Sequence, residues 1–321
     1  MEYPRRWLAA AFALAGASAF AQAVYPDHAV QIVVPIQQGG IIDAVAKPLA
    51  EQMSKSTGQS VVTDYQPGAL TNTGTVFVAH APGDGYTLLA HSRQMVNNKF
   101  IFKQLPYDIQ RDFVPISLVA KTGFLVVVYP QFGARSVREL IAMARAAPGR
   151  IRYANSGKAS NQQMSMELFK LLAKVDIARA EFDGGGPAQD ALVKGEADVG
   201  IFATVAVAQM VREGRMRALA TTGLKRDPAL PEVPTVVESG LPGYEFTSWV
   251  GLFAPAATPP QRVAAIHAAV VQAARDPAFV ARMQKQGAEV VADSPEEFRA
   301  FIKSELGRWG EVIRQAGIQP E

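Results

Sequence analysis

Short runs of β-branched and aliphatic residues alternate with longer segments of helical periodicity along most of the chain. Residues 30–35, 61–63 and 86–90 fit buried strands, and residues 43–55 have the apolar spacing of a helix between the first two. Alternation of this kind predicts an α/β fold in which helices cover a mainly parallel sheet. Capping-box sequences that begin at Ser136 and Ser294 predict two further helix starts.

The strand pattern also predicts two lobes. Two strand-like runs, residues 115–120 and 124–129, are separated by residues 121–123 alone, which are too few for a helical crossover. We interpret this junction as a first passage between lobes. A second α/β series follows, with strands at residues 151–154, 180–182, 197–202 and 217–221 and helices from about Ser160, Pro187 and Val205.

The C-terminal part of the pattern predicts a return to the first lobe. Residues 227–244 are rich in proline, residues 247–254 resume a strand, and the remainder is helical. We therefore expect a discontinuous first lobe, residues 24–121 plus about 245–321, and a second lobe, about 122–244. Two such lobes leave a cleft at the C-terminal ends of their strands, where ligands of α/β proteins bind.

The N-terminus has the pattern of a secretory signal peptide. Arg5 and Arg6 precede an apolar run, residues 7–20, which ends in the small-x-small triplet of residues 21–23. The run is too short to span a hydrocarbon core of roughly 30 Å. We expect cleavage after Ala23 and release into the periplasm; an uncleaved amphipathic or anchor helix is the alternative, disfavoured because the run carries no polar face.

Composition narrows the classes of function. The formal net charge is only +3, and the basic residues are interleaved with acidic ones, which argues against a nucleic-acid binder. The absence of cysteine excludes disulfides, thiolate metal sites, cysteine nucleophiles and a lipid anchor on a cysteine. A hydrophobic content of 49% supports well-formed cores.

Polar, glycine-containing loops between strands and helices are the candidate binding residues. Gly39, Gly40 and Asp43 lie in the first such loop, where backbone amides at a helix start favour an anion such as a carboxylate. The alternative is that the glycines only form a turn and Asp43 only caps the helix. The loop is neither a dinucleotide fingerprint nor a phosphate loop, because the glycine spacing fits neither.

Three further loops have the same character. Ser156 and Ser160 follow a strand and precede a helix, with Ser160 also a plausible helix cap. Gly184 and Gly185 leave bare backbone before a helix, although a flexible connection is the alternative. Residues 91–97, which include Ser92, supply polar side chains after the strand at residues 86–90.

Catalytic and metal-binding interpretations have little support. The four histidines, at positions 28, 80, 91 and 267, have no metal-ligand spacing, and neither the His-Glu-x-x-His nor the Gly-x-Ser-x-Gly motif is present. His91 is the one nearest a predicted cleft, where a single histidine more often forms a hydrogen bond than acts as a base. We therefore expect no enzyme activity, no metal and no cofactor.

These motifs together resemble the substrate-binding proteins of tripartite tricarboxylate transporters, also called Bug proteins or TctC-like receptors. The likeness covers about residues 25–318. It is carried by Val30-Gln31-Ile32-Val33-Val34-Pro35, Gly39-Gly40-x-x-Asp43, Gln66-Pro67-Gly68-Ala69, Asp84-Gly85-Tyr86-Thr87-Leu88-Leu89, Leu105-Pro106-Tyr107-Asp108, Tyr153-Ala154-x-Ser156-Gly157, Gly240-Leu241-Pro242-Gly243-Tyr244 and Pro295-Glu296-Glu297-Phe298.

The resemblance implies a two-lobed periplasmic binding fold that closes by a hinge on a small organic acid, either a carboxylate or an amino-acid-like compound. It implies membrane transporter subunits as partners; a sensor that engages a signalling receptor is the alternative, and a hydrolytic enzyme a remote one. We expect a monomer. The family's ligand contacts, carried over by motif, fall on Gly39, Gly40, Asp43, Ser92, Ser156 and Gly157, and also on Gly184, Gly185 and Thr204.

The chain departs from the family pattern in ways that concern the ligand. Ile36, Gln37 and Gln38 precede the first glycine pair, and the bulky Ile41 and Ile42 follow it, which we expect to narrow this loop and make it less polar. Arg93 and Lys158 replace small or neutral residues. Our hypothesis is that one of them pairs with a ligand carboxylate; for Lys158, a solvated position at the rim is the alternative.

Overall fold

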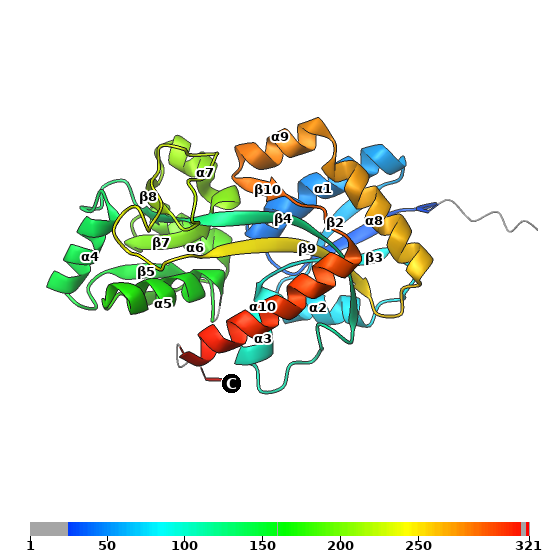
Figure 1. The fold of residues 1–321 in the computed structure, drawn as a ribbon, viewed down its shortest axis with the longest axis horizontal. Coiled ribbons are helices and arrows are strands. Elements are labelled where there is room, and N and C mark those ends of the chain that lie inside the picture. The colour runs from blue at the N-terminus through cyan, green and yellow to red at the C-terminus, as the bar shows by residue number, and fades with distance from the viewer. Residues whose placement is uncertain (1–24, 159, 316–318, 321) are drawn as a thin grey trace, which may run out of the picture.

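The computed structural model describes residues 25–158, 160–315 and 319–320. The predicted signal peptide, residues 1–23, therefore lies outside the described residues. Within these ranges, no helix combines the length and apolar character needed to cross a bilayer. Eight strands form one path in the order β2-β1-β3-β9-β4-β7-β5-β6, and β8 and β10 each pair with β4 off this path (Figure 1).

The first half of the sheet is an α/β unit built from the N-terminal residues. Strand β1 (Val30–Val34) pairs in parallel with β2 (Val61–Tyr65) and with β3 (Thr87–Ser92). Helix α1 (Ile41–Thr57) connects β1 to β2, and a 3₁₀ turn (Ala69–Thr71) with α2 (Asn72–Ala79) leads to β3. Helix α3 (Gln94–Ile101) follows β3 directly.

Two long strands join the halves of the sheet. Strand β4 (Phe113–Val128) is continuous through residues 121–123, so the two predicted runs form one strand. Its first part pairs antiparallel with β9 (Thr247–Pro255), and its last part, Phe124 to Val128, pairs antiparallel with β7 and β8. The sheet is consequently mixed: parallel within the outer strands of each half, antiparallel at the strands that pass between them.

The second half repeats the α/β arrangement. After α4 (Val137–Ala146), the parallel strands β5 (Arg152–Asn155), β6 (Ala178–Glu181) and β7 (Val199–Ala203) alternate with helices α5 (Asn161–Ala173) and α6 (Gly185–Val193). Helix α7 (Thr204–Arg212) and strand β8 (Arg217–Thr221) complete this half. The predicted alternation of strands and helices is confirmed here to within a few residues.

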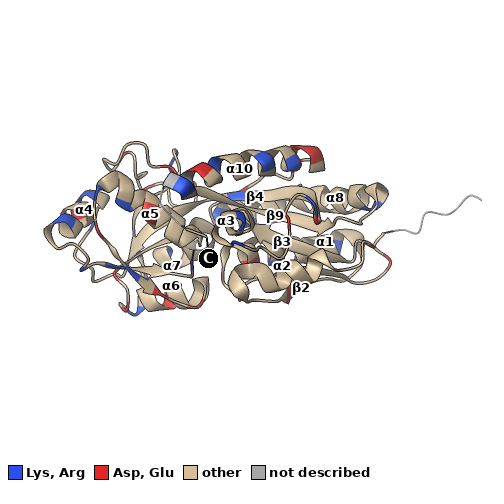
Figure 2. Cartoon of the chain, turned by 90° about the horizontal axis from the view of Figure 1, so that it is seen from below, with Lys and Arg blue, Asp and Glu red and all other residues tan. Residues whose placement is uncertain are grey.

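The C-terminal elements pack on the first half. Helix α8 (Pro260–Ala274), helix α9 (Pro277–Lys285) and strand β10 (Ala288–Val290) precede helix α10 (Pro295–Gln315), which runs beside the two long strands (Figure 1). The chain therefore returns to the first half of the sheet. Basic and acidic residues alternate along α10 (Figure 2), which leaves no one-signed stripe on this helix.

Strand β4 divides its side chains between two cores. Val126 and Val128 face a large core that contains residues from both halves, whereas Leu125 and Val127 face a smaller core built from the second half alone. Successive side chains of a strand point to opposite faces, so one strand can contribute to both. This shared strand fixes the position of each half at the place where they meet.

Candidate functional site

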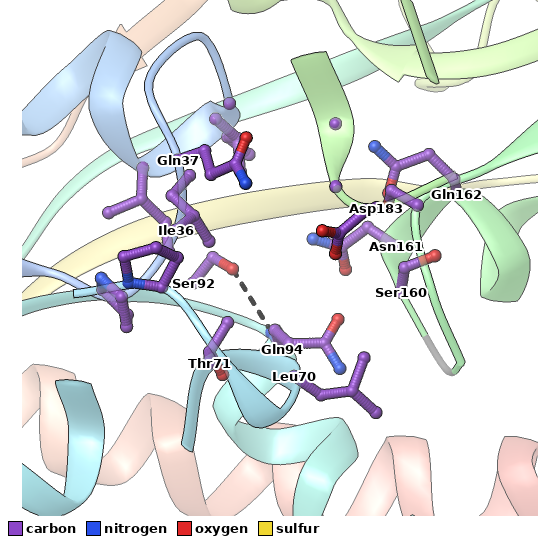
Figure 3. A pocket seen from close by; sticks show the side chains of 18 of the residues that line it. Ile36, Gln37, Leu70, Thr71, Ser92, Gln94, Ser160, Asn161, Gln162 and Asp183 are labelled. Atoms are coloured by element: carbon purple, nitrogen blue, oxygen red, sulfur yellow. Dashed lines mark hydrogen bonds between the residues drawn. The ribbon is translucent and has the colours of Figure 1, made fainter. Parts of the chain in front are cut away.

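A cavity of about 180 Å³ lies between the two halves, where loops from both come together (Figure 3). We call its two sides the first wall and the second wall. The first wall comes from the first half and consists of Pro35, Ile36, Gln37, Gly40, Ile41, Ile42, Pro67, Gly68, Ala69, Leu70, Thr71, Ser92 and Gln94. The second wall comes from the second half and consists of Ser156, Ser160, Asn161, Gln162, Asp183, Gly184 and Gly185.

The glycine pair before α1 shapes one part of the first wall. Gly40 is the N-cap residue of α1, and a Cβ added there would lie 2.5 Å from Ile36 Cδ1, so glycine is what allows Ile36 to pack against the loop. Asp43 does not line the cavity. Its carboxylate accepts hydrogen bonds from the Gly39 backbone N–H (2.9 Å) and the Tyr65 hydroxyl (2.5 Å), and therefore holds the loop in place from behind.

A turn with left-handed backbone forms another part of the first wall. Ala69, Leu70 and Thr71 have φ values of 45°, 54° and 76°, a region that residues with a Cβ rarely occupy. The buried Asn98 amide holds this turn by donating to the Leu70 carbonyl (2.8 Å) and the Asn72 side-chain oxygen (2.9 Å). Tertiary hydrogen bonds therefore stabilise a conformation that the local sequence does not favour.

His91 supports the same turn from the end of β3. The Ser92 N–H donates to His91 Nδ1 (2.8 Å), so a neutral ring can donate from Nε2 to Thr71 Oγ1 (3.1 Å). His91 is fully buried, and this burial lowers its pKa to about 4. The imidazole is thus neutral at physiological pH and acts as a structural hydrogen-bonding residue.

Ser92 and Arg93 are neighbours in sequence but point to different places. Ser92 lines the cavity and its hydroxyl accepts from the Gln94 N–H (3.3 Å), the bond drawn in Figure 3. The Arg93 guanidinium instead lies between Phe246 and Trp309, 4.5 Å and 4.3 Å from the ring centroids, with Nε 3.3 Å from Glu305 Oε2.

The hypothesis that Arg93 pairs with a ligand carboxylate does not fit this position. Burial lowers the pKa of Arg93 to about 10, an effect that the Glu305 carboxylate opposes. Glu305 also accepts from Trp249 Nε1 (2.8 Å), so it joins α10 to the strand β9 and to the residue next to Ser92. Arg93 therefore positions the first wall and does not face the cavity. Lys158 is also absent from the cavity lining.

The second wall is held mainly by short-range hydrogen bonds, with one long-range bond from Asn161 Nδ2 to Ser248 Oγ on β9 (3.3 Å). The Ser156 hydroxyl donates to Gln162 Oε1 (2.9 Å), and the Ser160 hydroxyl donates to Asn155 Oδ1 (2.9 Å) while it accepts from the Gln163 N–H (3.2 Å). Ser160 is thus the N-cap of α5, as its position in the sequence predicts. Gly184 has a φ of 104° and is the N-cap residue of α6.

Five α-helices begin at the cavity. The N-cap or first residues of α1, α2, α3, α5 and α6 all contribute to its lining, through Gly40, Thr71, Gln94, Asn161 and Gly185. Among the described residues that line the cavity there is no Lys, Arg or His, and Asp183 is the one charged side chain. Free N–H groups and the partial positive charge of helix N-termini are therefore what the site offers to an anion.

The structure brings together six of the residues singled out from the sequence: Gly40, Ser92, Ser156, Ser160, Gly184 and Gly185. Gly39, Asp43 and Gly157 lie next to the lining without belonging to it. Thr204 is buried at the start of α7, where its methyl group packs against Gly287, and it does not line this cavity.

Sequence reasoning missed several polar lining residues. Asn161 and Gln162 occupy the first turn of the helix that Ser160 caps, and Asp183 directly precedes Gly184. These three residues could have been found because each lies beside a residue that the sequence already placed at the site. Gln94 is the first residue of α3, two residues after β3, and lies within the polar run of residues 91–97 noted from the sequence. Leu70 and Thr71 gave no signal, because an apolar and a β-branched residue are not expected in left-handed backbone.

The fold and the site define a class: a two-lobed α/β binding protein with a candidate binding cavity between its lobes, at the N-terminal ends of five helices. The chain matches the model of the tripartite tricarboxylate transporter family receptor over residues 45–318, and it belongs to this family. The resemblance stated from the motifs is therefore confirmed, and the protein is a solute-binding receptor of the TctC or Bug type.

Relatives support the same assignment along the whole chain. A UPF0065 protein in the tcbD-tcbE intergenic region of Pseudomonas sp. strain P51 is 35% identical over 96% of this chain and 94% of its own. Protein BugT of Bordetella pertussis is 33% identical, with 92% of this chain and 91% of its own covered.

Solved structures with the same fold include two with bound acids. R. palustris Rpa4515 with adipate has a TM-score of 0.89 and 32% identity, covering 92% of this chain and 100% of the other. MatC from Rhodopseudomonas palustris with bound malate has a TM-score of 0.84 and 32% identity, covering 90% and 100%. The periplasmic binding protein fold expected from the resemblance is confirmed by these likenesses.

Proposed function

We propose that this protein is a periplasmic receptor that captures a small organic acid in the cavity between the first and second walls. The observation that carries the proposal is the convergence of five helix N-termini on a cavity without a cationic side chain among its described lining residues. The structures of relatives with adipate and malate support an acid as the ligand.

Backbone amides are suited to a carboxylate for an electrostatic reason. The first N–H groups of a helix lack partners within the helix, and the aligned peptide dipoles place partial positive charge at the same point. Hydrogen bonds to an ionised oxygen are shorter and stronger than those between neutral groups. Ser92 and Ser156, one from each wall, add hydroxyl groups that can donate to or accept from the bound acid.

We infer that ligand binding closes the two lobes about the strands they share. The lobe boundaries are proposed at residues 121–123 of β4 and at the start of β9, so the first lobe comprises residues 24–121 and about 245–321. A ligand that contacts both walls favours the closed arrangement by its differential affinity for it. Ligand capture and change of shape are then one event.

The proposed location is the periplasm, and the proposed partners are the membrane subunits of a tripartite tricarboxylate-type transporter. The signal-peptide pattern of residues 1–23 supports the location, and the family supports the partners. A sensor protein is the second candidate. Deletion of the gene separates the two: loss of labelled-acid uptake indicates transport, whereas loss of an acid-induced transcriptional response with normal uptake indicates sensing.

The test of the acid-receptor function combines native mass spectrometry with thermal-shift screening of mono- and dicarboxylates. An acid that co-purifies, or one that raises Tm with saturable dose dependence, supports the proposal. Ser156→Asp places a negative charge on the second wall and is expected to abolish the shift. Ser60→Asp, at an exposed position before β2, is the matched control and is expected to retain it. Absence of a shift with every acid contradicts the function.

A further inference from the structure

The two walls approach each other closely at two separate places. At the first place the contact is made by backbone: a Cβ added at Gly185 would lie 4.0 Å from the Gly40 Cα, and one added at Gly186 would lie 3.5 Å from the Gln38 carbonyl oxygen. At the second place the contact is made by a side chain. A Cβ added at Gly157 would lie 2.9 Å from Leu70 Cδ2, so the Leu70 side chain reaches across from the first wall to the loop that carries Ser156 of the second wall.

Leu70 makes this contact from an unusual backbone position. Its φ and ψ are 54° and 49°, between Ala69 and Thr71, which are also left-handed. Glycine or asparagine is the ordinary occupant of such a position. The hydrogen bond from Asn98 to the Leu70 carbonyl fixes the turn, so the isobutyl group is held in one direction.

The direction taken by Leu70 places an apolar group at the edge of the cavity. Leu70 is half-buried and belongs to the lining, and Figure 3 shows it below Gln94 and Ser160. Gly157 has a φ of 120°, so a larger residue is strained there, and the bare backbone of this glycine is what gives Leu70 its place. Leu70, packed against Gly157, therefore bounds the cavity on this side.

We propose that Leu70 is a specificity-determining residue that limits the length of the acid the cavity accepts. This inference rests on the proposed function. The cavity of about 180 Å³ is bounded by the Leu70 contact on one side and by the glycine contacts of Gly40 and Gly185 on another. A longer acid meets the isobutyl group, whose volume leaves no room for the end of the longer chain.

Leu70→Gly tests the proposal, because it removes the isobutyl group and keeps a residue suited to left-handed backbone. Binding of the linear dicarboxylates from malonate to suberate is measured by calorimetry for the wild type and the variant. We expect the wild type to prefer the short acids. In Leu70→Gly the ratio of affinities, long acid to short acid, is expected to rise at least about tenfold.

Leu70→Asn separates the size of the side chain from the strain of the turn. Asparagine tolerates left-handed backbone and is branched at the same position as leucine, so this variant relieves strain and retains the obstruction. It is expected to keep the wild-type limit of length. Leu171→Ala, an exposed leucine on α5, is the surface control and is expected to leave all affinities unchanged.

The outcomes distinguish the inference from the function on which it rests. If acids bind but the affinity ratio in Leu70→Gly stays within about twofold of the wild-type ratio, the role of Leu70 is wrong and the acid-receptor function stands. If the wild type already binds suberate more tightly than succinate, the role of Leu70 is likewise wrong and the acid-receptor function stands. If no acid binds to the wild type or to any variant, both proposals are overturned.

Discussion

The two walls of the cavity are built by different means. The first wall depends on partners distant in sequence: Thr71 on His91, Leu70 on Asn98, and Arg93, which supports Ser92 from behind, on Glu305 of the C-terminal helix. In the second wall, Ser156 and Ser160 are held by partners no more than six residues away. The first wall is therefore fixed by the folded core, whereas the second is fixed mainly by its own loops and helix caps.

Because of this difference, we expect stability and ligand affinity to be coupled in the first wall more than in the second. A change behind the first wall removes a buried partner and is expected to lower the free energy of unfolding as well as the affinity. A change in the second wall is expected to affect the affinity with a small cost in stability. The predictions below test this contrast, from the largest expected effect to the smallest.

Glu305→Ala is expected to have the largest effect on stability. It leaves the buried Arg93 guanidinium, whose side chain is 3% exposed, without its carboxylate, and it removes the acceptor of Trp249 Nε1. Loss of one partner of a buried ion pair costs about 3–5 kcal/mol. Urea unfolding measures the loss.

The matched control for Glu305→Ala is Glu51→Ala. The Glu51 carboxylate is 2.7 Å from Arg282 Nη1, but both side chains are about half exposed, at 46% and 45%. Exposed pairs contribute at most about 1 kcal/mol. Equal losses of unfolding free energy in the two variants would show that the buried Arg93–Glu305 pair stabilises the protein no more than an exposed pair does.

The pH dependence of stability is expected to report on His91. Burial lowers its folded-state pKa from 6.5 to about 4, so between these values the unfolded chain binds a proton that the folded protein does not. The free energy of unfolding therefore falls as the pH falls from 6.5 to 4, by about 3 kcal/mol from this group. Urea unfolding as a function of pH measures the slope.

His91→Gln isolates the contribution of the histidine to that slope. Asp293 acts in the opposite direction, because burial raises its pKa to about 6 and the folded protein takes up a proton as the pH falls through this value. Asp293 is present in both proteins, so its effect cancels in the difference. Between pH 4 and 6.5 we expect the free energy of unfolding to rise more steeply with pH in the wild type than in His91→Gln. Identical slopes would mean that His91 is accessible to protons in the folded state.

Asn98→Ala is expected to affect stability and affinity together. The substitution leaves the Leu70 carbonyl and the Asn72 amide oxygen without a buried donor, at a cost of about 1–3 kcal/mol. The left-handed turn is then free to relax, which weakens binding of the best acid. Gln209→Ala removes an exposed amide on α7 and is expected to change neither property. An unchanged affinity in Asn98→Ala would show that the conformation of the left-handed turn does not affect acid binding.

Asp183→Asn is expected to change affinity by up to about tenfold, with little effect on stability. Asp183 is the charged side chain in the described lining, and its exposed carboxylate repels an acid. We expect its removal to tighten binding of plain carboxylates such as succinate in calorimetry. A weaker affinity in the variant for aspartate, measured in the same way, would instead indicate a ligand whose ammonium group the carboxylate attracts.

Two N-cap serines provide the smallest and most closely matched comparison. Ser160→Ala and Ser294→Ala each remove a hydroxyl that accepts a backbone N–H at a helix start, and each is expected to cost about 1 kcal/mol of stability. Only Ser160 lines the cavity, so only Ser160→Ala is expected to weaken acid binding. A loss of affinity in both variants would point to a general effect of stability on binding.

Local signals in the sequence determined much of the fold. Alternating strand and helix periods placed most elements to within a few residues, and strand β8 at the predicted residues 217–221. Cap residues such as Ser160 and Ser294 marked helix starts because a side-chain oxygen next to a free N–H acts over a few residues. Ser156, Gly184 and Gly185 were predicted at the site because they lie in polar, glycine-containing loops between a strand and a helix, and all three line the cavity.

Tertiary structure alone decided the direction of Arg93 and the contacts of the first wall. The sequence placed Arg93 beside Ser92 but contained no signal that Phe246, Trp309 and Glu305 would enclose its guanidinium. Likewise, the left-handed conformation of Leu70 depends on Asn98, which lies on a helix that follows a different strand. Local patterns act through neighbours along the chain, whereas buried charges and strained turns exist only where distant segments supply their partners.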